Sequence, residues 1–344
     1  MALALPVLAH PGPASPSDAV PGQSSLFTTY PGKKTPLAPQ YLKPIPATEK
    51  GPAGQDDLLF QNLLAAEWAI YSFYQLGVET FSSSDFAKKG YPNTTYQRIT
   101  EMRDNEAGHV RIFQEQISKN SVKPGPCQYN FAKSVGKSPE AYLAFQVFLE
   151  VSSMAYLTGL IDQADLNISK SALMAIGQVE SRHNAWALID AWNTSPFSGP
   201  SDTVYPYANQ ILDSTNTFIV TGSCPSENPP YPYPNQHLPQ LAFKKKGTTG
   251  KPGSTIEFVW KDKKPTFDKK EYFAVFYHGV HHISVPYNPK ENRVEIPAEF
   301  DSGSSIIIVI IADTKDAPTE QSVVAGPLII LEQPGALTKQ VNAV

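Results

Sequence analysis

Between residues 56 and 193, apolar positions recur three or four places apart, which is the spacing of an amphipathic α-helix. In the first segment this stripe contains Leu59, Leu63 and Ile70. The third segment has a strong start signal, because Ser138 can cap a helix and Pro139 suits its first position. The predicted helices span residues 56–81, 95–119, 139–163 and 169–192.

The connections between these helices predict how the helices run. The first and second helices, and the third and fourth, are joined by short connections. The second and third are separated by residues 120–137, which could span nearly 60 Å at about 3.3 Å per extended residue. Such a crossover is longer than the helices, so it would let the second and third helices run parallel.

From about residue 240 the pattern changes to short apolar runs separated by turn residues, which is typical of strands. The runs are "STIEFVW", "EYFAVFY", "HHISVPY", "NRVEIP", "SSIIIVIIA" and "GPLIILE". A region of this kind favours a β-sandwich of about seven strands. We therefore predict an α+β multidomain chain, with a four-helix bundle followed by a C-terminal β-sandwich.

Proline-rich stretches flank the predicted bundle. The segment before it is also rich in Gly, Ser and Thr, and we expect an extended arm or a disordered segment there. The expected parts are a proline-rich arm at 1–55, the bundle at 56–195, a proline-rich linker at 196–239 and an immunoglobulin-like β-sandwich at 240–335.

Composition excludes some partners. The net charge of −4 and the pI near 6.0 give no electrostatic reason to expect nucleic acid or an anionic membrane surface as a partner. No apolar stretch reaches the roughly 20 residues that a membrane span needs.

The sequons and the two cysteines favour secretion, and the N-terminus gives no clear signal peptide. The N-terminal "ALALPVLA" contains a proline and follows no basic residue, so it is a poor signal peptide but could be the remainder of a trimmed leader. N-glycosylation sequons begin at Asn93, Asn167 and Asn193. Cys127 and Cys224 could form a disulfide, although two unpaired thiols are the alternative, because the sequence gives no distance between them.

Acidic and histidine side chains lie on the apolar faces of the predicted helices. In "EMRDNEAGHVRIF", Glu106 and His109 fall on the same face as Met102 and Val110. The fourth helix repeats this spacing in "VESRH". The first and third helices each carry one glutamate on the apolar face, near the midpoint of the helix. The six residues are Glu67, Glu106, His109, Glu150, Glu180 and His183.

All six positions are close to the middle of their helices, so packing of the helices would bring them to one level. Four buried carboxylates repel one another unless positive charge is present, and two divalent metal ions would supply it. One Glu from each of two helices and Glu-x-x-His from each of the others is the ligand pattern of di-metal carboxylate bundles. Either Glu–His pair alone could be an exposed surface pair, but the apolar stripes include both.

Residues 56–193 resemble a ferritin-like domain, because the order Glu, Glu-x-x-His, Glu, Glu-x-x-His matches the complete ligand set of that family. The resemblance implies two divalent ions, iron or manganese, with Glu67, Glu106 and His109 in one half of the site and the other three residues in the second half. In one common arrangement Glu67 and Glu150 bridge the metals and the other glutamates are terminal, and the reverse is open. Tyr71, one turn after Glu67, could donate a hydrogen bond near the site, be redox-active, or simply pack in the core.

The whole layout, and phrases such as "LLAAEWAIYSFYQ", resemble the secreted fungal ferritin-like proteins of stress response, late sexual development and desiccation. The resemblance implies either an oxidoreductase acting on O2 or peroxide, or a non-catalytic stress protein whose metals stabilise the bundle. We expect a monomer or dimer, because the arm and β-domain would obstruct a cage.

The β-domain offers a weaker candidate site. We expect this domain to pack on the bundle or to bind a cell-wall polymer or a protein. Its "HGVHH" stretch, with His278, His281 and His282, could be a second metal site, but no acid or cysteine is nearby, so a loop or packing role is expected.

Overall fold

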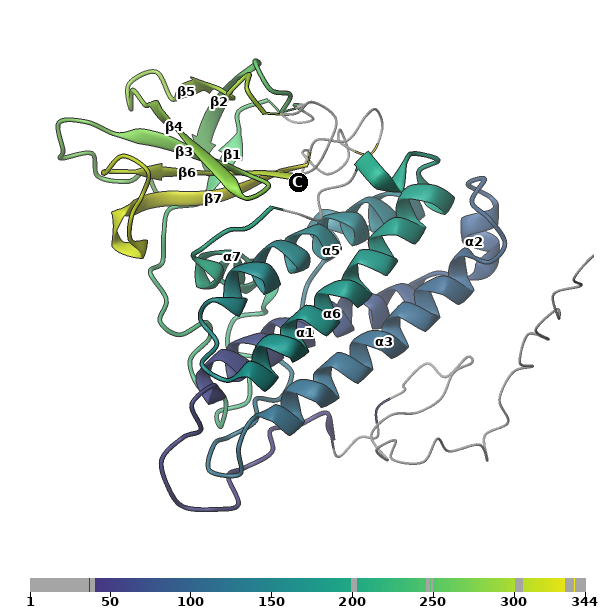
Figure 1. The fold of residues 1–344 in the computed structure, drawn as a ribbon. Helices are drawn as coiled ribbons and strands as arrows, with labels where there is room; N and C mark the ends of the chain where they lie inside the picture. Colours follow the sequence, from purple (N-terminus) through teal and green to yellow (C-terminus); the bar gives the residue numbers. More distant parts are fainter. Residues whose placement is uncertain are drawn as a thin grey trace, which may run out of the picture.

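Helices form one part of the molecule and antiparallel sheets the other (Figure 1). The computed structural model describes residues 37, 41–198, 203–245, 248, 250–300, 306–331 and 337. Most of the predicted arm, including "ALALPVLA", and residues 332–335 of the predicted β-sandwich lie outside the described residues.

The four predicted long helices are present with nearly the predicted bounds. They are α1 (Asp57–Thr80), α3 (Thr95–Gln116), α5 (Pro139–Ile161) and α6 (Asn167–Trp186). Ser138 caps α5 as predicted, since its side chain accepts a hydrogen bond from the backbone N–H of Ala141. A π-helical turn, η2 (Ala187–Ala191), continues α6, and the short α2 (Ser83–Ala87) and α4 (Ala132–Val135) lie in the connections.

Ring contacts fix the directions of the helices. Phe81, just after α1, packs on Tyr142 near the start of α5, with ring centroids 5.4 Å apart. Phe60, at the start of α1, packs on Phe113 near the end of α3, at 5.9 Å. Since α1 is antiparallel to both helices, α3 and α5 are parallel, as the long crossover predicted.

The crossover between α3 and α5 is attached along its length. Cys127 and Cys224 form a disulfide, which decides the question that the sequence left open. The indole N–H of Trp68 donates to the Pro124 carbonyl at 2.8 Å. Ile45 pairs with Lys123 in an antiparallel bridge, so the described end of the N-terminal arm runs along the crossover.

The segment that follows the bundle is more ordered than a proline-rich linker implies. It contains η3 (Pro196–Ser198), α7 (Ala208–Thr215) and η4 (Asn216–Phe218). Ala208, Ile211 and Leu212 are buried in the core that includes α5. Because α7 is only eight residues long, its apolar stripe is too short to stand out in the sequence.

The described strands form two antiparallel sheets. One has the order β1 (Leu241–Phe243), β2 (Thr255–Trp260), β5 (Arg293–Glu295). The other has the order β4 (His281–Pro286), β3 (Phe273–His278), β6 (Ile306–Ala312), β7 (Val323–Leu331). The α+β architecture is therefore as predicted, while the three-residue β1 is an addition.

Strand β6 is buried on both faces. Ile307, Val309 and Ile311 pack in the core between the two sheets. Ile306, Ile308 and Ile310 belong to the core that also contains the helices. This explains the unbroken apolar run, because alternation is lost when both faces of a strand are covered. The β-domain thus packs on the bundle, with β7 near α7 (Figure 1).

Helix α5 is the one described helix that is long and apolar enough to cross a membrane, and 78% of its most apolar 18-residue window is buried inside the protein. It packs against α6 and α7. The apolar composition of α5 is therefore that of a central core helix, and it gives no clear membrane span.

Candidate metal centre

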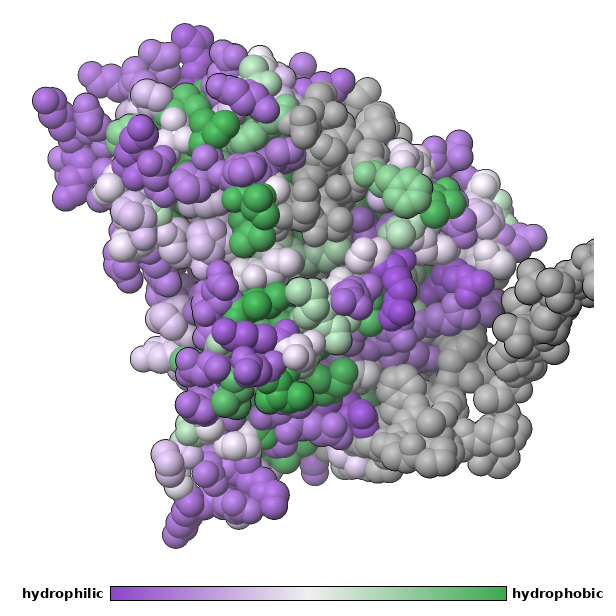
Figure 2. All heavy atoms as spheres, viewed as in Figure 1, coloured by the Kyte–Doolittle hydropathy of each residue, from purple (hydrophilic) through white to green (hydrophobic). Residues whose placement is uncertain are grey.

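The acidic residues are buried because they share stripes with the apolar residues that form the core. On α1, Glu67 lies among the buried Leu63, Leu64 and Ile70. The buried residues of α6 include Leu173, Ile176, Glu180 and His183, while Ile168 and Met174 face outward. On the face shown in Figure 2, small apolar patches are scattered among hydrophilic residues over the helices.

The structure brings all six predicted residues together in the middle of the bundle. Each is at most 5% exposed. Nδ1 of His109 lies 2.9 Å from Oε2 of Glu106, 3.2 Å from Oε1 of Glu67 and 3.4 Å from Oε1 of Glu180. These contacts join α1, α3 and α6.

The second histidine is placed in the same way. Nδ1 of His183 lies 3.1 Å from Oε1 of Glu106 and 3.3 Å from Oε1 of Glu150. Both imidazoles therefore turn the same ring nitrogen toward the carboxylates, and α5 completes the set of four helices.

The six residues form two overlapping groups of possible ligands. One contains Glu67 and His109, the other contains Glu150 and His183, and Glu106 and Glu180 belong to both. Within each group the donor atoms lie within 4.8 Å of one another. The shared position of Glu106 and Glu180 favours these two as bridging carboxylates, the reverse of the arrangement that the sequence analysis stated first.

Burial and mutual repulsion shift the ionisation of the cluster. Burial, with the nearby Glu106 charge, raises the pKa of Glu67 well above its usual range, and burial with the Glu150 charge does the same for Glu180. Burial opposes the charge on Glu106, but the neighbouring His109 outweighs it and lowers the pKa of Glu106.

The imidazoles hold protons more tightly than usual. Burial alone would lower the pKa of His109, but the Glu106 charge raises it to about 10. The Glu150 charge similarly outweighs burial and raises the pKa of His183 to about 9. Protons thus supply the positive charge that the carboxylates require.

Protons do not satisfy all of the buried atoms. Oε1 of Glu106, Oε2 of Glu150, both oxygens of Glu180 and Nδ1 of His183 are buried without a hydrogen bond. Leaving such atoms unsatisfied costs about 1–3 kcal/mol each, and more when they are charged. Carboxylate oxygens and imidazole nitrogens are ligands of divalent iron and manganese, so the cluster fits a di-metal site.

Residues 55–189 match the family model described as the ferritin-like domain. This chain carries a ferritin-like domain. The match covers all six residues of the cluster and the whole of the four long helices. None of the curated proteins with which the chain was compared matches it.

Of the roles that the sequence left open for Tyr71, the structure favours packing in the core. Tyr71 of the ferritin-like domain packs edge-on against Trp68 at 5.9 Å, and its hydroxyl has no hydrogen-bond partner among the described residues. Burial raises the pKa of Tyr71 to about 12. Tyr74, three residues later, donates a hydrogen bond to Oε1 of Glu150.

One other polar contact with the cluster was not predicted. Oδ1 of Asn105 lies 3.0 Å from Nε2 of His183. Asn105 directly precedes Glu106, but nothing in the sequence shows which histidine it would reach.

The "HGVHH" stretch is the tight turn between β3 and β4, in which His278 pairs with His281. Nδ1 of His278 lies 3.1 Å from the Ile306 carbonyl oxygen, while His281 and His282 are exposed. These histidines are in neither of the two groups of possible metal ligands found among the described residues.

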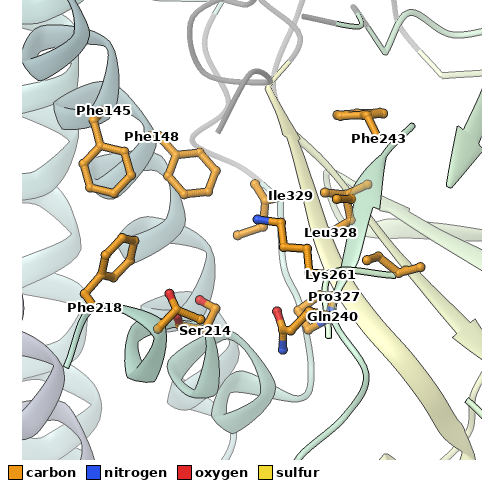
Figure 3. A pocket seen from close by; sticks show the side chains of 13 residues that line it. Phe145, Phe148, Ser214, Phe218, Gln240, Phe243, Lys261, Pro327, Leu328 and Ile329 are labelled. Atoms are coloured by element: carbon orange, nitrogen blue, oxygen red, sulfur yellow. The ribbon is translucent and has the colours of Figure 1, made fainter. Parts of the chain in front are cut away.

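A groove lies between the outer face of α5 and the β-domain (Figure 3). Phe145, Phe148 and Phe218 line one side, and Leu328 and Ile329 line the other. None of the six cluster residues lines this groove. The cluster is thus separate from the groove between the two parts of the chain.

Proposed function

We propose that the ferritin-like domain binds two divalent ions, iron or manganese, and acts as an oxidoreductase on O2 or peroxide. The overlapping ligand groups around Glu106 and Glu180 carry this proposal. Glu67 and His109 would complete one metal site, and Glu150 and His183 the other.

When bound, a dinuclear centre of this kind would relay electrons from an added reductant to O2, or from one peroxide molecule to another in dismutation. The contribution of the chain is a set of ligands buried in the core of the bundle. The cluster residues are almost fully buried, which keeps bulk water away from the reacting centre. The Nδ1 atoms of His109 and His183 face inward, and the hydrogen bond from Tyr74 orients Glu150.

A non-catalytic stress or metal-binding protein is the second candidate. Its support is that each of the four long helices contributes at least one cluster residue, so bound ions would crosslink the whole bundle. Such a protein would lose stability when metal is removed but would turn over neither O2 nor peroxide.

Secretion and a role in stress protection or desiccation are part of the proposal. The Cys127–Cys224 disulfide supports an oxidising compartment. Asn93, Asn167 and Asn193 are all exposed, as glycan acceptors must be. The stress and desiccation roles rest on the resemblance to secreted fungal ferritin-like proteins.

We also propose that the β-domain binds a cell-wall polymer carrying negative charge, with a protein partner as the alternative. Lys264, Lys269, Lys270 and Lys290 line a cleft between the β2–β3 and β4–β5 connections, together with a single carboxylate, Glu271. Binding of acidic but not neutral polysaccharide, lost in Lys269→Glu/Lys270→Glu, would support it. A monomer or dimer, rather than a cage, is expected in light scattering.

The decisive experiment begins with protein purified from its native host. Mass spectrometry should find two iron or manganese ions per chain, and anomalous scattering at each metal edge should identify them. O2 uptake with a reductant, or O2 release from peroxide, then distinguishes the candidates. Two bound metals without either reaction would overturn the enzyme proposal in favour of the non-catalytic one.

A further inference from the structure

The two halves of the cluster differ in the contacts that hold their ligands from outside. In the Glu150–His183 half, both ligands have such a contact. Tyr74 donates its hydroxyl hydrogen to Oε1 of Glu150, and Asn105 lies 3.0 Å from Nε2 of His183. The two contacts come from α1 and α3, so they hold this half from two other helices.

Tyr74 is itself fixed by its surroundings. Its side chain is fully buried, and its ring packs edge-on against Phe73 at 5.4 Å. Its hydroxyl lies 3.7 Å from the sulfur of Met102, and the ring lies 6.3 Å from that of His183. A donor with so little freedom restricts Glu150 to one orientation and leaves Oε2, which has no hydrogen bond, available.

Asn105 selects the tautomer of His183. In the neutral imidazole that binds a metal, an Nε2–H that donates to Oδ1 of Asn105 leaves Nδ1 without a proton. The Nδ1 lone pair then points at the cluster, where Glu106 and Glu150 lie 3.1 and 3.3 Å away. A metal-binding imidazole needs this tautomer, and an outer hydrogen bond of this kind is how proteins usually fix it.

The Glu67–His109 half has no equivalent contact among the described residues. The hydrogen bonds found for Glu67 and His109 join them to each other and to Glu106. Nε2 of His109 has no hydrogen-bond partner in the described part of the chain. This half therefore depends on contacts within the cluster, which change when protons leave and metal enters.

We propose that the two metal positions are unequal: the Glu150–His183 position fills first and binds more tightly, and the Glu67–His109 position is the exchangeable one. Tyr74 and Asn105 are the positioning residues that create the difference. This inference rests on the proposed function only in assuming that the cluster binds two divalent ions. Loss of such an outer contact typically lowers metal affinity about 10- to 100-fold.

The proposal is tested by calorimetric titration of the full-length, metal-free protein with Mn²⁺. The unmodified chain should bind in two resolved steps. Tyr74→Phe and Asn105→Ala should each weaken the first step about 10- to 100-fold and leave the second nearly unchanged. Tyr71→Phe is the matched control, since Tyr71 is also buried on α1 but has no hydrogen bond to lose.

Titration with Co²⁺ adds a spectroscopic reading that loss of stability alone would not produce. The visible spectrum of the first Co²⁺ equivalent should shift in both variants and stay constant in Tyr71→Phe. Asn105 is exposed, so its replacement leaves the core intact even if Tyr74→Phe folds poorly. The proposal of unequal positions would be wrong if the unmodified chain bound both ions with the same affinity. It would also be wrong if Tyr74→Phe and Asn105→Ala both left the affinities unchanged. A protein that binds no metal at all would instead overturn the proposed function.

Discussion

Glu106 on α3 and Glu180 on α6 both belong to each half of the buried cluster. Oε1 of Glu106 lies near His183 on α6, and Oε1 of Glu180 lies near His109 on α3, so the sharing is reciprocal. A bridging role predicts that Glu106→Ala or Glu180→Ala removes both metals, whereas Glu67→Ala removes only one. Metal content by mass spectrometry should fall from two per chain to none in the first two variants and to one in the third.

The outcome for Glu67→Ala separates the two arrangements. If Glu67 and Glu150 bridge instead, Glu67→Ala should lose both ions and Glu106→Ala should keep one. Circular dichroism of each metal-free variant controls for loss of the helical fold.

Metal removal should lower stability. An ion that binds only the folded chain adds about 2.7 kcal/mol to the free energy of unfolding when its free concentration is about 100 times its Kd. The melting temperature should therefore fall on addition of a chelator and recover with excess Mn²⁺ or Fe²⁺. Glu106→Ala provides the control, because its melting temperature should not respond to the chelator.

Metal uptake should release protons and strengthen as the pH rises. With pKa values raised to about 10 and about 9, His109 and His183 carry protons at pH 7 in the metal-free protein, and the raised pKa values of Glu67 and Glu180 make these carboxylates hold protons more tightly than usual. Binding requires those protons to leave, so affinity must increase with pH. Calorimetry in two buffers of different ionisation enthalpy measures the release, and an identical heat in both buffers would contradict it.

Acid should remove the stabilisation that the Asp57 carboxylate gives to the first turn of α1. The carboxylate of Asp57 accepts hydrogen bonds from the backbone N–H and hydroxyl of Ser118 and from the N–H of Gly54. Burial opposes ionisation, but these hydrogen bonds outweigh it and lower the pKa of Asp57 below its usual 3.8. The stabilisation is thus complete above about pH 4 and is lost as the pH falls through the folded-state pKa.

Asp57→Asn should lower the free energy of unfolding at pH 7 by about 1–3 kcal/mol, because hydrogen bonds to a charged group contribute about this much. The variant should also show a smaller stability loss than the unmodified chain between pH 5 and about pH 3 in urea denaturation. Asp85→Asn is the comparison, because the Asp85 carboxylate also accepts hydrogen bonds, from Ser82, but at an exposed helix start where solvent weakens them. An acid-induced stability loss as large in Asp57→Asn as in Asp85→Asn would argue against the role of Asp57.

The disulfide should contribute strongly to stability. Cys127 and Cys224 are separated by 97 residues, and closing a loop of that length stabilises a fold by several kcal/mol in the chain-entropy view. Cys127→Ser/Cys224→Ser should lower the free energy of unfolding by about 2–5 kcal/mol. Urea denaturation of the double variant, and of the unmodified chain with and without reductant, measures it. Equal midpoints would show that the crossover is held by its other contacts alone.

The sequence predicted the helices and the convergence of the six cluster residues because both depend on local periodicity. An apolar stripe that includes Glu67 fixes which way that glutamate faces, and a mid-helix position fixes its level. The role of each glutamate as a metal ligand stays a prediction.

The residues that touch the cluster from outside could not be predicted, because they depend on how the helices rotate and approach one another. Tyr71 lies one turn after Glu67, yet it packs on Trp68, while Tyr74 reaches across to α5. The approach of α1 to α5 is unusually close at Gly77, where an added Cβ would lie 2.2 Å from the hydroxyl of Tyr142. A single sequence carries no record of such a distance.

Because β6 is buried on both faces, the helices and the sheets cannot be separated without exposing apolar side chains. Removing the bundle would expose Ile306, Ile308 and Ile310 on one face of β6, and removing the sheets would uncover α7. The boundary between the two parts is a shared interior rather than a hinge. Each part therefore covers apolar surface of the other, and we expect the two to unfold in one cooperative transition.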